Sequence, residues 1–224
     1  MTYLQLVQRL AREVDEASVP STTVSATGEA LNLCNWINTA WMDIQGLHQD
    51  WGWKRTTTSF VTVAAQAIYT TAQAGTTNFG MWVKDQFRNY LTASGNTAEI
   101  PMTFMEYEHW RDVYQFGSNR TATAQPYFFT ILPNKSIGLG PVPLVGYTVT
   151  ADYFTCPTEM SADADEPALP THYHMAIVYK AMMDYGAFEG ASEVYQRGEG
   201  KFKALMHRIE NDYLPEVEFA GAML

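Results

Sequence analysis

The sequence predicts an α+β protein: a helical bundle formed by the N- and C-terminal helices, with an antiparallel β region inserted between them. Apolar residues recur at helical spacing near both ends of the chain. Between them lie β-branched runs separated by proline, glycine and asparagine turns. We therefore expect a bundle of residues 1–52 and 168–214, a β-rich insert of residues 53–167 with a short helix, and an extended C-terminal tail of residues 215–224.

The N-terminal part of the bundle is predicted to contain two helices. The first covers residues 2–16, with Thr2 as its N-cap because a hydroxyl there can accept a backbone N–H. A polar loop over residues 17–28 separates it from a longer helix over residues 28–50. Trp36 lies off the apolar stripe of this second helix. The stripe consists of Leu33, Ile37, Ala40, Trp41, Ile44, Leu47 and Trp51.

The insert opens with a strand over residues 54–63, where threonine and valine are frequent. After a polar loop, a second strand is predicted over residues 81–93. Residues 104–116 have the pattern of a short helix among the strands.

A β-hairpin is the clearest signal in the insert. Residues 127–132 and 137–140 are apolar runs on either side of a Pro-Asn-Lys-Ser turn. Residues 147–154 then alternate as a further strand. The side chains that face one way are Tyr147, Val149, Ala151 and Tyr153.

The C-terminal part of the bundle is predicted as two helices, over residues 171–188 and 191–214. Gly190, Gly198 and Gly200 lie at their junction and in the last helix, where each costs roughly 1 kcal/mol relative to alanine. The glycines therefore indicate a hinge or a close helix contact.

Composition favours a protein that buries surface against partners. Charged residues make up 17%, below the roughly 25% that is usual for soluble domains, and aromatic residues reach 13%. The aromatic content fits an aromatic-rich core equally well. The net charge of −10 argues against a simple DNA-binding protein, which needs a basic surface, but is compatible with a surface past which DNA slides.

The two cysteines and the chain start give no sign of secretion. Cys34 and Cys156 are far apart in the sequence and are expected to be buried free thiols. We expect neither a signal peptide nor a membrane span.

No strong catalytic, metal or cofactor motif is present in the sequence. His172 and His174 are two positions apart, so they would lie on different faces of a helix. Asp163 and Asp165 resemble the start of a calcium loop but lack its glycine and its bidentate glutamate. We therefore expect no metal, no cofactor and no catalytic residue.

The remaining candidates also favour structural roles. Glu106, Glu108 and Asp112 could supply paired carboxylates for acid/base catalysis. Their positions fit the solvent-exposed face of the short helix better. Trp110-Arg111 could stack on bases, yet its segment is net negative. The Gly138-Leu139-Gly140 run lies in a hairpin and cannot hold a phosphate at a helix start.

Several segments, taken together and in order, resemble phage head-to-tail adaptor proteins, also called head-completion or connector proteins. Each segment alone is weak, but the series spans nearly the whole chain. The segments are residues 1–6, 36–45, 51–53, 66–69, 129–141, 163–170 and 174–178.

This resemblance implies a structural virion protein, not an enzyme, that forms a ring between the portal and the tail. The ring is usually of twelve copies, docks under the portal after DNA packaging and continues the DNA channel. The resemblance further implies that the C-terminal segment grips the portal and that the β region faces a tail or nozzle protein. DNA would pass without specific binding, and the protein would be made in the host cytoplasm.

Two sets of residues are candidates for these contacts. The portal-binding candidates lie in the apolar tail and are Pro215, Val217, Phe219, Met223 and Leu224. The subunit-interface candidates are expected surface aromatics, Trp36, Trp51, Trp53 and Trp110.

Three other functions remain open from the sequence. The first is another tail ring or tube component, such as a terminator or nozzle. The second is a tail-associated cell-wall hydrolase, for which no acid/base pair stands out. The third is a binding module without a phage connection, which would stay a soluble monomer.

Overall fold

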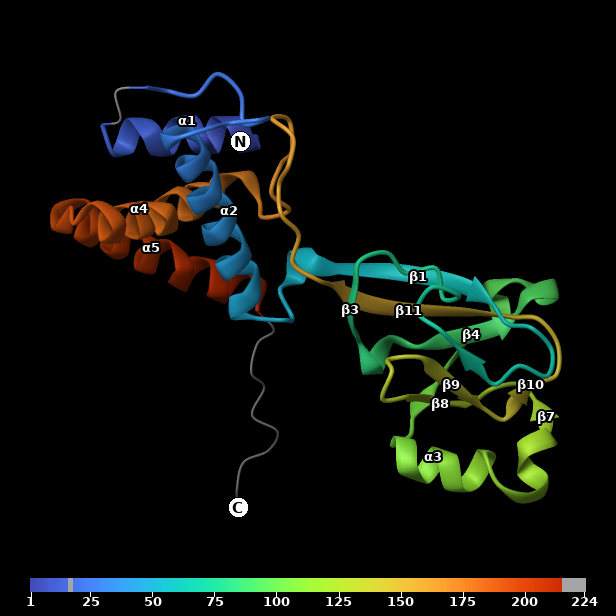
Figure 1. Cartoon of the computed structure of the whole chain (residues 1–224). Coiled ribbons are helices and arrows are strands. Elements are labelled where there is room, and N and C mark those ends of the chain that lie inside the picture. The colour runs from blue at the N-terminus through green and yellow to red at the C-terminus, as the bar shows by residue number, and fades with distance from the viewer. Residues whose placement is uncertain (16–17, 215–224) are drawn as a thin grey trace, which may run out of the picture. The chain divides into compact units, whose positions relative to one another are not determined.

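The computed structural model describes residues 1–15 and 18–214 and has the predicted α+β class (Figure 1). The chain divides into two compact units. The helical unit contains residues 1–54 and 157–224, and the β unit contains residues 55–156. Within the described residues, no helix is long and apolar enough to cross a membrane.

The helical unit is built around α4. The helices α4 and α5 run side by side, and α1 and α2 also pack against α4 (Figure 1). The described α-helices of this unit are α1 (Tyr3–Glu13), α2 (Glu29–Leu47), α4 (Met175–Glu189) and α5 (Ser192–Tyr213). Short 3-10 turns cover Gly52–Lys54 and Thr171–Tyr173. Side chains with almost no exposure include Leu6, Leu10, Leu33, Ile37, Trp41, Ile44, Trp51, Ile177, Val178, Met182 and Ile209.

The first helix starts as predicted but ends at Glu13, short of residue 16, and the second helix also ends earlier than predicted. Thr2 caps α1 in a capping box: its hydroxyl accepts the Gln5 N–H, and the Gln5 side chain accepts the Thr2 N–H at 3.0 Å. The prediction that the second helix reaches residue 50 is wrong. Trp51 is buried because the chain turns back after α2, and its indole N–H donates to the Ile44 carbonyl at 2.9 Å. Trp51 therefore has the sequence spacing of the apolar stripe and is buried with it, although it lies after the end of α2.

The acidic loop before α4 belongs to the helical unit, not to the insert in which the sequence placed residues 157–167. Hydrogen bonds along two helices explain the difference. The Gln45 side chain donates to the Thr158 carbonyl at 3.0 Å, and Asn38 donates to the Met160 carbonyl at 2.9 Å. The Tyr3 N–H, in the first turn of α1, donates to the Asp165 carbonyl at 2.7 Å.

The glycines of α4 and α5 mark a close helix contact. A Cβ at Gly198 would lie 2.8 Å from the Tyr179 carbonyl, and one at Gly186 would lie 2.8 Å from the Tyr195 nitrogen. Gly190 ends α4 in the left-handed conformation, with φ +68°. A Cβ at Gly200 would meet nothing within 4 Å.

The β unit contains two main sheets. One has the order β1-β11-β4-β5, with β3 also paired to β11, and the other has the order β2-β9-β8-β6. Pairing is antiparallel except for the short pairs β6–β8 and β7–β10. The longer strands are β1 (Arg55–Val61), β3 (Phe79–Trp82), β4 (Arg88–Leu91), β8 (Phe128–Ile131), β9 (Ile137–Gly140) and β11 (Tyr147–Thr155). The two-residue strands are β2 (Ile68–Tyr69), β5 (Ile100–Pro101), β6 (Thr103–Phe104), β7 (Thr123–Ala124) and β10 (Val142–Pro143).

The single strand predicted over residues 81–93 is two strands. Both β3 and β4 pair with β11, β3 with its C-terminal end and β4 with its N-terminal half. Residues 83–87 bulge out between them through a 3-10 turn at Lys84–Gln86. Phe87 accounts for the interruption because its ring is buried and stacks on Phe129 with 3.9 Å between ring centroids.

The predicted short helix is α3 (Tyr107–Tyr114), and it packs on the hairpin through two glycines. A Cβ at Gly138 would lie 2.8 Å from the Trp110 ring, and one at Gly140 would lie 2.6 Å from the Tyr114 ring. Because the two glycines have no side chain, aromatic rings of α3 can pack directly against the backbone of β9.

Candidate assembly surfaces

Two of the four tryptophans predicted at a subunit interface are not on the surface. Trp51 is 0% exposed in the core of the helical unit, and Trp110 is 1% exposed beneath α3. The expectation that these two residues lie on the surface is therefore wrong. Their sequence patterns did not reveal that the chain folds back after α2, or that glycines open a site on β9.

Trp53 is half-buried, and other aromatic rings cover much of it. It stacks on Trp51 with 4.3 Å between ring centroids and meets Tyr213 edge-to-face at 5.2 Å. Its remaining exposure leaves it as a weaker interface candidate.

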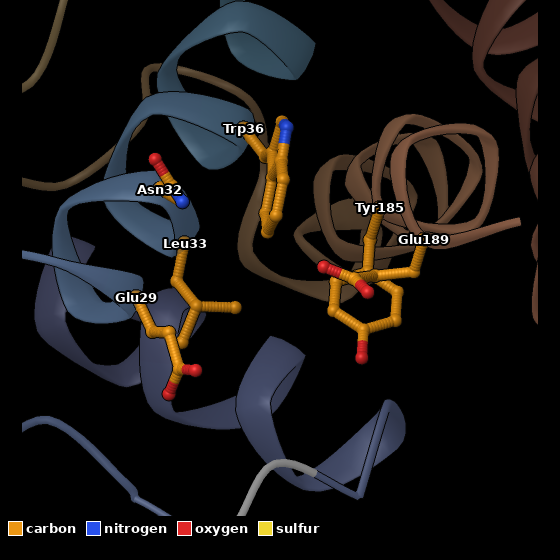
Figure 2. Close-up of a pocket in the computed structure, with 6 residues that line it drawn as sticks. All are labelled: Glu29, Asn32, Leu33, Trp36, Tyr185 and Glu189. Atoms are coloured by element: carbon orange, nitrogen blue, oxygen red, sulfur yellow. The ribbon is translucent and has the colours of Figure 1, made fainter. Parts of the chain in front are cut away.

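Trp36 lines an open hollow between α2 and α4, which we call the aromatic groove. Figure 2 shows Trp36 and Leu33 on α2 opposite Tyr185 and Glu189 on α4. The groove holds about 220 Å³ and is lined by Glu29, Asn32, Leu33, Trp36, Tyr185 and Glu189. The Trp36 ring meets Tyr185 edge-to-face, with 5.4 Å between centroids.

An exposed aromatic side chain lies beside the aromatic groove. Phe188 is 68% exposed, and its ring centroid lies 5.6 Å from that of Trp36. Sequence reasoning missed Tyr185, Phe188 and both glutamates as a site. A usable signal was present, because Trp36 lies off the apolar stripe of its helix.

The net charge of the protein lies entirely in the helical unit. Residues 1–54 and 157–224 contain 8 basic and 18 acidic side chains, a net charge of −10. Residues 55–156 contain 6 of each, so the β unit is neutral. A field of this sign repels nucleic acid from the helical unit.

The β unit exposes an apolar tip, formed by Val61, Val63, Leu144 and Val145, each at least 41% exposed. Backbone contacts join its two segments, since the Thr62 N–H donates to the Tyr147 carbonyl and the Ala65 N–H donates to the Pro143 carbonyl. No charged residue occurs in residues 56–83 or 136–151. An apolar surface without charges typically meets another protein.

The two histidines considered as metal ligands lie in different surroundings. His172 is exposed, whereas His174 is buried. One ring nitrogen of His174, Nε2, lies 2.7 Å from the Leu169 carbonyl and donates to it, because a carbonyl only accepts. Nδ1 then accepts from the Met1 amino nitrogen at 2.6 Å. No cluster of three metal-ligating side chains occurs among residues 1–15 and 18–214.

The two aspartates of the acidic loop accept hydrogen bonds within the chain: Asp163 joins the loop to Thr22 and Thr23, and Asp165 holds the loop's own turn. The Asp163 carboxylate accepts the side-chain and backbone donors of Thr23 and the Thr22 hydroxyl, at 2.6–2.8 Å. The Asp165 carboxylate accepts the Ala162 and Ser161 N–H groups at 2.8 and 2.7 Å. These hydrogen bonds lower the pKa of both carboxyl groups. They give the carboxylates a structural role.

The other candidates have no arrangement that favours chemistry. Glu106, Glu108 and Asp112 are exposed at α3, as expected for its wet face. Cys34 is buried, and burial raises the pKa of its thiol, whereas Cys156 is only half-buried, contrary to expectation. The portal-binding candidates Pro215, Val217, Phe219, Met223 and Leu224 lie outside the described residues.

A family model described as SU10 adaptor protein matches residues 1–217 of the chain. Comparison with curated proteins gives no match.

Proposed function

The chain belongs to the SU10 adaptor family, a family of phage adaptor proteins, and from this membership we propose that it forms a ring that joins the portal to the tail. The match over residues 1–217 is the observation that carries the proposal. We propose twelve copies, as the resemblance of the sequence implies. The ring would be a virion part without catalytic activity.

The charge distribution supports an orientation of the units in this ring. We propose that the helical unit faces the DNA channel, since its residues 1–54 and 157–214 hold 8 basic and 16 acidic side chains, a net charge of −8. Like charge keeps DNA from sticking to the wall, so the genome slides past without specific binding.

The two ends of the ring would use different surfaces. We propose that the apolar tip of the β unit contacts the tail or nozzle protein, because an uncharged apolar patch loses little on desolvation. We propose that residues 215–224 bind the portal, because they contain Val217, Phe219, Met223 and Leu224 and no basic side chain.

A two-ended binding assay tests this proposal. The full chain, a variant lacking residues 215–224 and the variant Val63→Asp/Leu144→Asp are mixed separately with purified portal and with purified tail. We expect the truncated protein to lose portal binding only and the tip variant to lose tail binding only. Circular dichroism of each variant verifies folding. Truncated protein that still binds portal particles would refute the role of the tail segment.

The same assay separates the adaptor from another tail ring or tube component. A terminator or nozzle would bind tail parts and leave the portal free. For the hydrolase alternative, a cell-wall zymogram is the direct check, and we expect no clearing. Clearing that disappears in Glu106→Gln and Glu108→Gln would overturn the structural assignment.

A further inference from the structure

We propose that the aromatic groove of one copy receives Arg208 from the α5 helix of the neighbouring copy in the ring. The inference rests on the proposed function, since it concerns the contact between ring subunits. It assigns a chemical class of occupant, an arginine side chain, to a groove between α2 and α4.

The lining of the aromatic groove selects a guanidinium group. Trp36 and Tyr185 supply aromatic rings, on which a cation can be held by the ring quadrupole (Figure 2). Glu29 and Glu189 supply carboxylates, which accept the paired N–H groups of arginine. Of the residues that the structure describes, no lysine or arginine lines the groove. An incoming basic side chain therefore meets attraction from both the rings and the carboxylates.

The same chemistry disfavours the tail of the chain as occupant. Residues 215–224 contain Glu216 and Glu218 and no lysine or arginine. Inserting that segment would place like charges beside Glu29 and Glu189, which costs binding free energy.

The neighbour offers a basic stripe on α5. Arg197, Lys201 and Arg208 follow one another at spacings of four and seven residues, so they lie along one side of the helix. Arg197 donates to the Glu13 carbonyl, and Lys201 lies 5.0 Å from the centroid of the Tyr179 ring. Arg208 is exposed, and its charge acts on the hydroxyl of Tyr173, which donates to the Asp212 carboxylate. Among residues 1–15 and 18–214, no hydrogen bond or ion pair occupies its guanidinium group.

A closed ring also needs two different patches on each copy. Heterologous contacts join one surface of a subunit to another surface of the next. The groove lies between α2 and α4, whereas the basic stripe lies on α5, so one compact helical unit carries both halves of the contact. In subunits of net charge −10, pairing a basic stripe with an acidic groove also offsets like-charge repulsion.

Charge reversal in the full chain tests the contact. Glu189→Arg and Arg208→Glu are made singly and together, and ring formation on purified portal is measured by electron microscopy and native mass spectrometry. We expect each single variant to weaken ring formation by about tenfold or more, and the double variant to recover most of the loss. Matched controls on α5 are Glu193→Arg and Lys203→Glu, which we expect to form rings normally.

The outcomes separate this inference from the proposed function. Wild-type rings together with normal rings from both single variants would overturn the groove contact and leave the adaptor function standing. Loss in the single variants without recovery in the double variant would overturn the pairing of Arg208 with the groove. A wild-type protein that forms no ring on the portal would overturn both. Thermal unfolding of each variant shows whether the helical unit stays folded.

Discussion

The two units of this chain differ in both charge and core. Residues 55–156 carry equal numbers of basic and acidic side chains, whereas residues 1–54 and 157–224 carry the whole net charge of −10. The cores also differ in composition. Among the described residues, half of the buried core cluster of the β unit is aromatic, whereas the larger cluster of the helical unit is mainly aliphatic and has four buried aromatic residues, Tyr3, Trp41, Trp51 and Tyr173.

This difference shows how one chain can present two kinds of surface to an assembly. Uncharged surface is inexpensive to bury against a partner, whereas acidic surface stays in water and repels DNA. Separate cores let each surface keep its own geometry, because each unit buries its own apolar cluster.

The largest expected effect is Trp110→Ala in the β unit. Removing a fully buried indole should lower the free energy of unfolding of that unit by about 3–5 kcal/mol, because α3 loses its contact with Gly138. Hydrogen exchange measured peptide by peptide should show faster exchange in residues 55–156 and unchanged protection in α1, α2, α4 and α5. Equal loss of protection in both units would contradict independent cores.

A smaller effect is expected for Gly198→Ala in the helical unit. The new methyl group would press on the Tyr179 carbonyl, which is backbone and cannot rotate away, so we expect a loss of about 1–3 kcal/mol. Gly200→Ala is the matched control on the same helix, where a Cβ meets nothing within 4 Å. Alanine there should be neutral or stabilise by up to about 1 kcal/mol. Urea unfolding of both variants measures the difference, and equal midpoints would refute close packing of α4 and α5.

Mild acid should act on the helical unit alone. Burial lowers the pKa of His174 below its ordinary value of 6.5, and the Met1 amino group also disfavours the charged ring. The unfolded chain therefore binds the proton more readily, so stability is present above pH 6.5 and is lost as the pH falls through that value. The histidine of the β unit, His109, is exposed.

Hydrogen exchange at pH 7 and pH 5 checks this expectation. Protection of the helical unit should decrease at pH 5, and His174→Gln should flatten the decrease, because glutamine can still donate to the Leu169 carbonyl without titrating. An unchanged pH response in the variant would assign the effect to another group.

The smallest effect on stability is expected for Phe188→Ala. Its side chain is 68% exposed, so the free energy of unfolding should change by no more than about 0.5 kcal/mol. Ring formation should nevertheless weaken, because Phe188 extends the aromatic surface beside Trp36. A stable variant that still assembles normally would show that this edge of the groove is not buried in the ring.

The units also differ in how well the sequence predicted them. The long helices have repeated apolar positions, so their existence and order were predicted correctly, with errors of a few residues at the ends. The five two-residue strands have no periodicity to detect, and their pairing depends on distant partners. The interruption between β3 and β4 likewise depends on a tertiary contact, the stacking of Phe87 on Phe129.

The candidate surfaces were less predictable than the elements. All three residues are tryptophans, so residue type alone could not show which of them is accessible. Trp36 lines an open groove, whereas Trp51 and Trp110 are buried. That distinction depends on a reversal of the chain after α2 and on glycines in another segment. Glu29 and Glu189 both line the aromatic groove although they are 160 positions apart in the sequence, and only the tertiary fold brings them to the same site.

Electron microscopy of virions and portal complexes with this protein tagged tests the central claim most directly. The account predicts density for the protein in a closed ring between portal and tail, with the helical unit toward the channel and the apolar tip toward the tail. Density elsewhere in the particle, or no protein in virions at all, would contradict it.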